Sequence, residues 1–102
     1  MGIRRTAEDA RFSNMIRERD NWTCQRCGKR YEPPTRALHC AHLFTRRTKA
    51  TRFDPDNATA ACYGCHQFLD SHPASKHEFF FKLLGEKRFE AVAAKAHEKR
   101  DR

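Results

Sequence analysis

Two pairs of cysteines, each pair separated by two residues, constrain the fold of this chain more than any other feature of its sequence. The first pair is Cys24 and Cys27, the second is Cys62 and Cys65, and Cys27 and Cys62 are 35 positions apart. Two sulfurs at the CxxC spacing can turn onto one ion, and two such pairs complete the closed tetrahedron of thiolates typical of structural zinc. We therefore expect one tightly held Zn²⁺ per chain, which would supply much of the folding free energy.

The number of cysteines and the N-terminal residues indicate the compartment. The chain has five cysteines, whereas a disulfide framework normally uses an even number. Residues 1–10 lack the apolar segment of a secretory signal. We therefore expect a cytoplasmic, reducing compartment in which the thiols bind metal. The fifth cysteine, Cys40, is expected to be a buried small apolar residue, and a redox role for the pairs is disfavoured because no thioredoxin-like βαβ pattern is visible.

Length and charge restrict the class of protein further. The 102 residues predict a single domain, 1–102. No apolar run reaches the roughly 18 to 20 residues of a membrane span, so we expect no membrane partner. Lys and Arg number 21 and Asp and Glu 13, which gives a formal net charge of +8. This charge favours a polyanionic partner, most simply nucleic acid, over a surface that is merely basic and solvated.

The hydrophobic pattern predicts a small α+β fold. A helix is expected over residues 6–20, capped by Thr6, with Asp9 in its first turn. Two short strands, over residues 37–45 and 58–61, and a short helix ending at Pro73 would form the central core, residues 24–73. A capping-box pattern at Ser75 then opens the C-terminal helices over residues 75–100, which we expect to pack on the core through their apolar stripes.

The alternation of side chains in the first strand separates its two histidines. Residues 38, 40, 42 and 44 would share one face of the strand, so His42 lies on the face of Cys40. His39 would lie on the opposite face, together with residues 41 and 43. Any site built around His42 is therefore expected on the Cys40 face.

The order of cysteines, histidines and asparagine resembles that of a known family. The stretch from residue 39 to 73 reads HCAHLFTRRTKATRFDPDNATAACYGCHQFLDSHP and is similar to the HNH endonucleases of phages and prophages. The matching residues are His42 at the end of the first strand, Asn57 before the second strand and His66 directly after the last cysteine. The resemblance covers residues 24–73, about half of the chain. It implies a ββα-metal (His-Me finger) core braced by the zinc site.

The resemblance also implies roles for the three matching residues. His42 would be the general base, because a neutral imidazole accepts a proton near neutral pH. His66 would hold a divalent ion, Mn²⁺ or Mg²⁺, that acts as a Lewis acid on the phosphate. Asn57 carries an amide that both donates and accepts hydrogen bonds, and would either orient the loop of the base or join the metal shell.

One position departs from the family pattern. Many members carry Asp or His directly before the base, as the second metal ligand, and this chain has Ala41 there. The candidates for the second ligand are Asp70, Asp54, Asp56 and His39. Asp70 follows His66 by four residues and would share its helix face, and hard cations prefer oxygen ligands. His39 is less favoured, because it lies on the strand face opposite His42.

A basic stretch without acidic residues, residues 43–53, lies between His42 and Asn57. It holds the expected DNA-binding residues Arg46, Arg47, Lys49 and Arg52. Arginine suits bidentate contact with phosphate, although such a run can also be a solvated loop.

The function that the resemblance implies is cleavage of double-stranded DNA, with one nick per active site. A monomer would nick and a homodimer could cut both strands, and the sequence leaves the oligomeric state open. Two alternatives stay open as well. One is a non-catalytic zinc-binding module that binds nucleic acid. The other is a structure-specific or RNA nuclease on the same scaffold.

Overall fold

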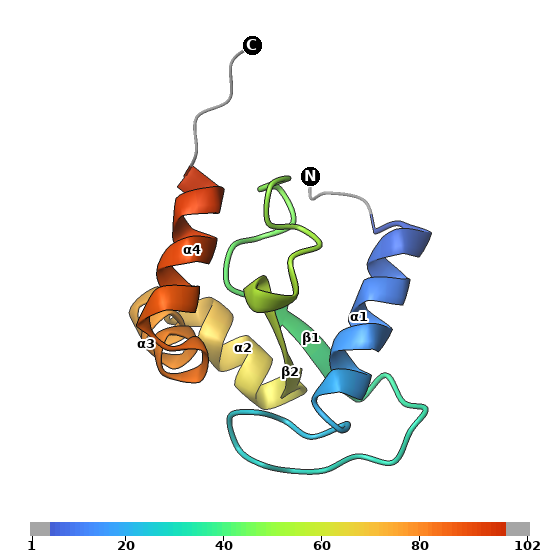
Figure 1. Ribbon diagram of the computed structural model, residues 1–102. Helices are drawn as coiled ribbons and strands as arrows, with labels where there is room; N and C mark the ends of the chain where they lie inside the picture. The colour runs from blue at the N-terminus through green and yellow to red at the C-terminus, as the bar shows by residue number, and fades with distance from the viewer. Residues whose placement is uncertain (1–4, 98–102) are drawn as a thin grey trace.

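The computed structural model describes residues 5–97, which form a small α+β fold around a two-stranded antiparallel sheet. The elements are α1 (Ala7–Arg19), β1 (Leu38–His42), the 3-10 turn η1 (Pro55–Asn57), β2 (Ala58–Cys62), α2 (Tyr63–Ser71), α3 (Pro73–Leu84) and α4 (Glu86–His97). Helix α1 lies on one side of the strands, and α2, α3 and α4 lie on the other (Figure 1). Within the described range, every helix is too short or too polar to cross a bilayer.

Helix α1 begins where its sequence predicts. Thr6 is the N-cap, and its hydroxyl accepts a hydrogen bond from the backbone N–H of Asp9 at 3.1 Å. The carboxylate of Asp9 in turn accepts from the backbone N–H of Thr6 at 2.8 Å, so two donors at the helix start are satisfied. The apolar face of the helix packs Phe12 and Ile16 against Ala58 of β2. The expected helix over residues 6–20 is confirmed, with caps at both ends.

The two strands form a hairpin with a long connection. Leu38 pairs with Cys62 and His42 pairs with Ala58, so the hairpin opens toward residues 43–57. Helix α2 begins directly after β2, at Tyr63. The first turns of α2 therefore lie next to the start of β1, because the end of β2 pairs with that start.

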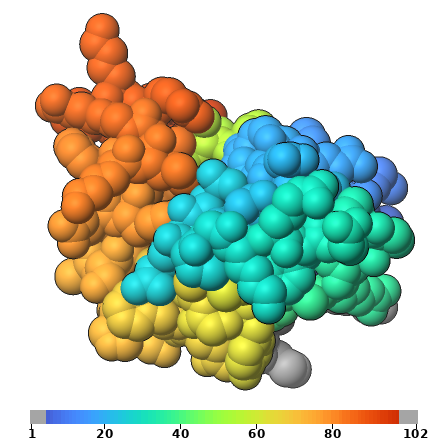
Figure 2. Space-filling model, turned by 90° about the horizontal axis from the view of Figure 1, so that it is seen from below, coloured from blue at the N-terminus to red at the C-terminus, as the bar shows by residue number. Residues whose placement is uncertain are grey.

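The segment between α1 and β1 carries the first cysteine pair. Gly28 adopts a left-handed conformation (φ 84°), which a glycine tolerates without steric cost and which closes the turn after Cys27. The backbone N–H of Gln25 donates to the carbonyl of Ala60 in β2 at 2.9 Å. Figure 2 shows this segment, in cyan and blue-green, lying against the start of α2 in yellow. The two cysteine pairs are thus brought to one place.

The last two helices pack on the central core, as their apolar stripes predict. Phe80, Leu84 and Val92 form a buried cluster with Leu43, which follows β1. Ion pairs at 2.6 Å link α4 to the turn before β2, between Arg88 and Asp56 and between Lys95 and Asp54. This packing makes α4 a support for the segment that leads into β2.

The start of α3 differs from its prediction. The capping-box pattern places the helix start at Ser75, whereas α3 begins at Pro73 with His72 as its N-cap. Proline suits the first helical position, because its missing N–H has no intrahelical acceptor there and its fixed φ is helical. The end of the expected range, residues 98–100, lies outside the described residues.

Candidate functional site

The four CxxC cysteines form one cluster. The Sγ atoms of Cys24, Cys27, Cys62 and Cys65 all lie within 4.8 Å of one another. The sulfurs of Cys27 and Cys62 are 3.8 Å apart. Four ligands bound to zinc at about 2.3 Å lie about 3.8 Å from each other in a tetrahedron, so the spacing suits a zinc site. Cys40 is outside the cluster, and its side chain packs against Phe12, Ile16 and Ala58.

The thiols of the cluster differ in pKa. Burial would raise the pKa of Cys24, but backbone N–H groups, first that of Cys27, outweigh burial and lower it to about 6. Burial raises the pKa of Cys65 to about 12. Arg26 donates to the sulfur of Cys65 at 3.4 Å and lies over the ring of Phe68 at 4.2 Å. Four neighbouring thiolates repel one another, so a cation bound among them would favour their joint ionisation, and the cluster is compatible with a metal site.

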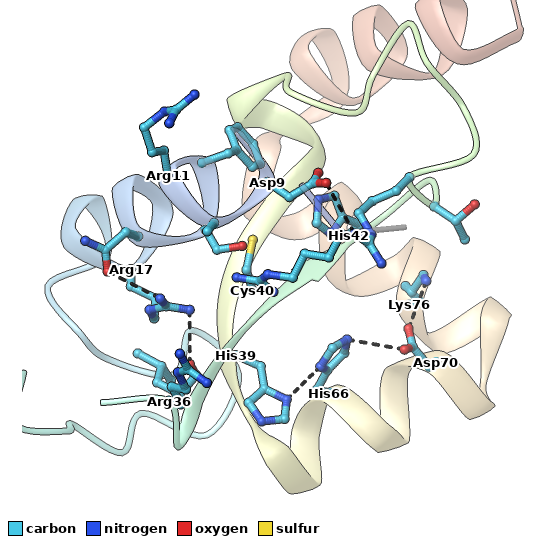
Figure 3. Close-up of a pocket in the computed structure, with 18 residues that line it drawn as sticks. Asp9, Arg11, Arg17, Arg36, His39, Cys40, His42, His66, Asp70 and Lys76 are labelled. Carbon is cyan, nitrogen blue, oxygen red and sulfur yellow. Dashed lines mark hydrogen bonds and ion pairs between the residues drawn. The ribbon is translucent and has the colours of Figure 1, made fainter. Parts of the chain in front are cut away.

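A cavity of about 1040 Å³ lies between α1, β1 and α2, and it brings His42 and His66 together (Figure 3). We call it the histidine cavity. His39, from the start of β1, also lines it. Its basic lining residues are Arg5, Arg11, Arg17, Arg36, Arg46 and Lys76. Its acidic lining residues are Asp9 and Asp70, so cations outnumber carboxylates on its walls.

His39 and His66 face each other in this cavity. Their Nδ1 atoms are 3.0 Å apart. On the other side of the His66 ring, Oδ2 of Asp70 lies 3.3 Å from Nε2, and Asp70 also pairs with Lys76 at 3.1 Å (Figure 3). The carboxylate favours a proton on Nε2, which leaves the Nδ1 lone pair directed toward His39. Burial lowers the pKa of His66 and favours the neutral ring that a metal ligand needs.

This geometry revises the ranking of the second-ligand candidates. His39 was the less favoured one, because it lies on the strand face opposite His42. It nevertheless reaches His66, since α2 starts at the end of β2 and β1 pairs His39 with Ala61 there. Asp54 and Asp56 bind Lys95 and Arg88 instead, and neither lines the histidine cavity.

His42 is held as a neutral imidazole. Burial, followed by the nearby charge of Arg46, lowers its pKa from 6.5 to about 4. The ring lies 6.0 Å from that of Phe12 in α1. Its Nε2 atom is buried and has no hydrogen-bond partner among residues 5–97. The side chain can therefore accept or donate a hydrogen bond to a molecule bound in the cavity.

Asn57 fixes the loop that follows His42. The side chain is fully buried. Its Oδ1 accepts from the backbone N–H of Phe44 at 2.8 Å, and its Nδ2 donates to the carbonyls of Phe44 at 2.9 Å and Thr51 at 3.1 Å. Both ends of the amide are occupied by backbone groups. Of the two roles left open for Asn57, the geometry favours orientation of the loop next to His42.

The residues of the basic stretch lie in different surroundings. Arg52 binds the buried carboxylate of Asp9 through Nε at 3.0 Å and Nη2 at 2.5 Å, and Arg46 lies 3.4 Å from the same carboxylate. The Arg52 contact holds the pKa of Asp9 well below its usual range. Arg47 and Lys49 are exposed. Arg52 thus ties the loop to α1, while Arg46 also lines the histidine cavity.

Several residues of the cavity were not anticipated from the sequence. Asp9 carries a helix-start signal, which gives no hint that it also anchors a loop 43 positions away. Arg17 is in α1, Arg36 precedes β1 and Lys76 is in α3, so no spacing in the sequence connects them. A charge on the buried side of an expected helix, as at Arg17, is the one signal that points to such a residue.

Comparison with known proteins adds no assignment. No protein-family model matches the chain, and no curated protein matches its sequence significantly. The site itself therefore carries the information on function. The candidate site has two parts, the cysteine cluster and the histidine cavity. The two parts meet in α2, where Cys65 and His66 are adjacent.

Proposed function

We propose that the protein is a metal-dependent endonuclease of the HNH type that hydrolyses DNA phosphodiester bonds and nicks one strand per active site. The observation that carries this proposal is the shared cavity of His42 and His66, whose walls are mostly basic. A neutral imidazole, a second imidazole suited to a metal ion and several cations together can supply the base, the Lewis acid and the phosphate contacts of phosphodiester hydrolysis. Asn57 supports the proposal by fixing the loop beside His42.

In the proposed mechanism, His42 activates the attacking water. The water oxygen forms a bond to phosphorus while its proton moves to the imidazole of His42; one P–O ester bond breaks, its electron pair goes to the leaving oxygen, and that oxygen takes a proton from solvent water. The lowered pKa keeps His42 unprotonated at neutral pH, so it is in the correct state to accept the proton. Arg46 and Lys76 line the same cavity and are suited to hold the non-bridging phosphate oxygens.

His39 and His66 are the proposed ligands of the catalytic ion, Mg²⁺ or Mn²⁺. The two Nδ1 atoms are 3.0 Å apart, so both would be able to hold one divalent ion. Such an ion supplies Lewis-acid stabilisation of the charge that develops on the phosphate and leaving oxygens. Asp70 orients the His66 ring from its Nε2 side.

The cysteine cluster is the proposed site of one structural Zn²⁺. The ion would join the segment around Cys24 and Cys27 to the end of β2 and the first turn of α2. Because His66 follows Cys65 directly, the zinc would fix the position of His66 as well. The zinc would therefore act on catalysis only through the geometry of α2.

The proposal is tested with supercoiled plasmid incubated with Mn²⁺ or Mg²⁺. We expect conversion to open circles, abolished by EDTA and slowed by His42→Ala about 100-fold or more, the usual contribution of a general base. The control is His77→Ala, which removes an exposed histidine outside the cavity and should nick at the wild-type rate.

Two results would overturn the proposal. If folded His42→Ala nicks as fast as wild type, His42 is not the base. If the wild-type protein binds DNA but cleaves neither DNA nor RNA with either ion, a non-catalytic zinc module is the function. Cleavage confined to RNA or to branched DNA would instead support the related nuclease on the same scaffold.

A further inference from the structure

One end of the histidine cavity carries uncompensated positive charge. Four arginines line the cavity, Arg5, Arg11, Arg17 and Arg36, and we call the part around Arg17 and Arg36 the arginine end. None of the four forms an ion pair with a carboxylate within residues 5–97. The two acidic residues of the cavity are already engaged, Asp9 by Arg46 and Arg52 and Asp70 by Lys76. The arginine end therefore lacks the anion that would balance it.

Arg17 is held in place at this end. Its guanidinium lies over the ring of Trp22 at 5.6 Å, and its terminal nitrogens contact the side chain of Asn14 at 3.3 Å and the carbonyl of Leu38 at 3.5 Å. Its Nε is buried and has no partner in the described part of the chain. A guanidinium positioned by its own protein contacts loses little freedom when it binds an anion.

Arg36 lies beside Arg17, just before β1. Both side chains line the histidine cavity and a second, smaller cavity next to it, which also contains Asn14, Pro34 and Thr35. Figure 3 shows the two guanidinium groups close together, away from His42. Burial is the main cause of the lowered pKa of Arg17, and the positive charges of Arg36 and Arg5 add to it. Two like charges gathered in one groove are stabilised by a bound anion.

We propose that Arg17 and Arg36 form a second phosphate-binding subsite, which holds a neighbouring phosphate of the DNA strand whose cleaved phosphate lies between His42 and His66. This inference rests on the proposed function, and it adds that the DNA strand is held through at least two of its phosphates. The subsite lies in the same cavity as the histidines, and the groove continues past it. A strand can therefore run from the histidines along α1 to the arginine end.

The first test measures binding without cleavage. A labelled 20-base-pair duplex is titrated with zinc-loaded protein at several salt concentrations, with no added Mg²⁺ or Mn²⁺. We expect Arg36→Gln to weaken binding about fivefold and to reduce the salt slope by about 1, because one phosphate contact is lost. Lys82→Gln is the matched control, since it removes one positive charge from an exposed site outside both cavities.

Equal affinities and salt slopes for Arg36→Gln and Lys82→Gln would overturn the inference and leave the nuclease proposal intact. A loss specific to Arg36→Gln in a protein that never nicks would refute the nuclease and keep the subsite. Arg17→Lys serves as a second variant that retains the charge but not the planar, bidentate group. It should also bind the duplex less tightly than Lys82→Gln.

The second test separates the two phosphates. Bis(p-nitrophenyl) phosphate contains one phosphodiester and has no neighbouring phosphate. We expect Arg36→Gln to hydrolyse it at the wild-type rate, while its KM for plasmid nicking rises about fivefold, in line with the lost contact. A parallel fall in activity on both substrates would place Arg36 at the cleaved phosphate and overturn the subsite. Inorganic phosphate should compete weakly, since each ion contacts only one of the two subsites that the strand contacts together.

Discussion

The Nδ1 atoms of His39 and His66 lie 3.0 Å apart, although the two residues are 27 positions apart in the sequence. Asp70 favours a proton on the opposite nitrogen of His66, so two ring lone pairs can face one another across this gap. Such an arrangement is favourable with a cation between the rings or with a shared proton. The pair therefore gives a direct test of the proposed catalytic metal site.

We predict that His39→Ala weakens the binding of Mn²⁺ at least tenfold, because one of two protein ligands is lost. Titration of the zinc-loaded protein with Mn²⁺, followed by electron paramagnetic resonance, measures the affinity in the absence of DNA. His77→Ala, which alters no cavity residue, should keep the wild-type affinity. Unchanged Mn²⁺ binding by folded His39→Ala would exclude His39 as a ligand.

Asn57→Ala should destabilise the protein by about 2 to 4 kcal/mol, because it leaves buried backbone groups of the loop without partners. The side chain makes three hydrogen bonds, two with Phe44 and one with Thr51. Asn57→Asp keeps the acceptor for the Phe44 N–H but loses both donors, so it should also be less stable than wild type. Urea denaturation measures the change, and a loss below about 1 kcal/mol would argue against the bracing role.

The lowered pKa of His42 predicts a stability change in mildly acidic solution. Between pH 6.5 and about 4 the unfolded chain binds a proton at this residue that the folded protein does not. The free energy of unfolding should therefore fall as the pH drops through this window, by at most about 3 kcal/mol. His42→Gln should show a smaller fall. Both proteins carry the same cysteines, so the difference between their urea denaturation curves reports on His42.

Asp9 provides the contrast in pH dependence. Its pKa is held below its usual value, first by the hydrogen bond from Arg52. Its contribution to stability is therefore present above pH 3.8 and is lost only as the pH falls further.

If His42→Gln and wild type lose stability in parallel between pH 6.5 and 4, His42 is not the source of the change in stability with pH.

Removal of the proposed structural zinc should unfold the chain. The buried clusters are small, and the cluster around Trp22 consists largely of alanines and two of the four cysteines. We predict about one zinc per chain, and loss of near-ultraviolet and far-ultraviolet circular dichroism on treatment with a strong zinc chelator. Cys27→Ser, at an exposed ligand, should lower the zinc affinity, while Cys40→Ser should keep one zinc. A chelated protein that stays folded would contradict this role.

Local sequence signals specified the elements well. The capping pair of Thr6 and Asp9 placed α1, because both hydrogen bonds form within one turn of the chain. The CxxC spacing brought the two sulfurs of each pair together. Gly28 permitted the tight turn that follows Cys27. The start of α3 was wrong by two residues, since a proline at the first helical position competed with the Ser75 pattern. These are short-range effects, and a single sequence contains them.

The sequence by itself determined the four-cysteine set and the elements that carry His42, Asn57 and His66, because these depend on spacing within a few residues. Tertiary structure alone decided that His39 meets His66, that Asp54 and Asp56 pair with α4, and that Asp9 anchors Arg52. Those contacts depend on the register of β1 with β2 and on how α1 and α4 pack against the hairpin. Pairing between distant segments is set by the summed burial of many side chains, so no local pattern encodes it.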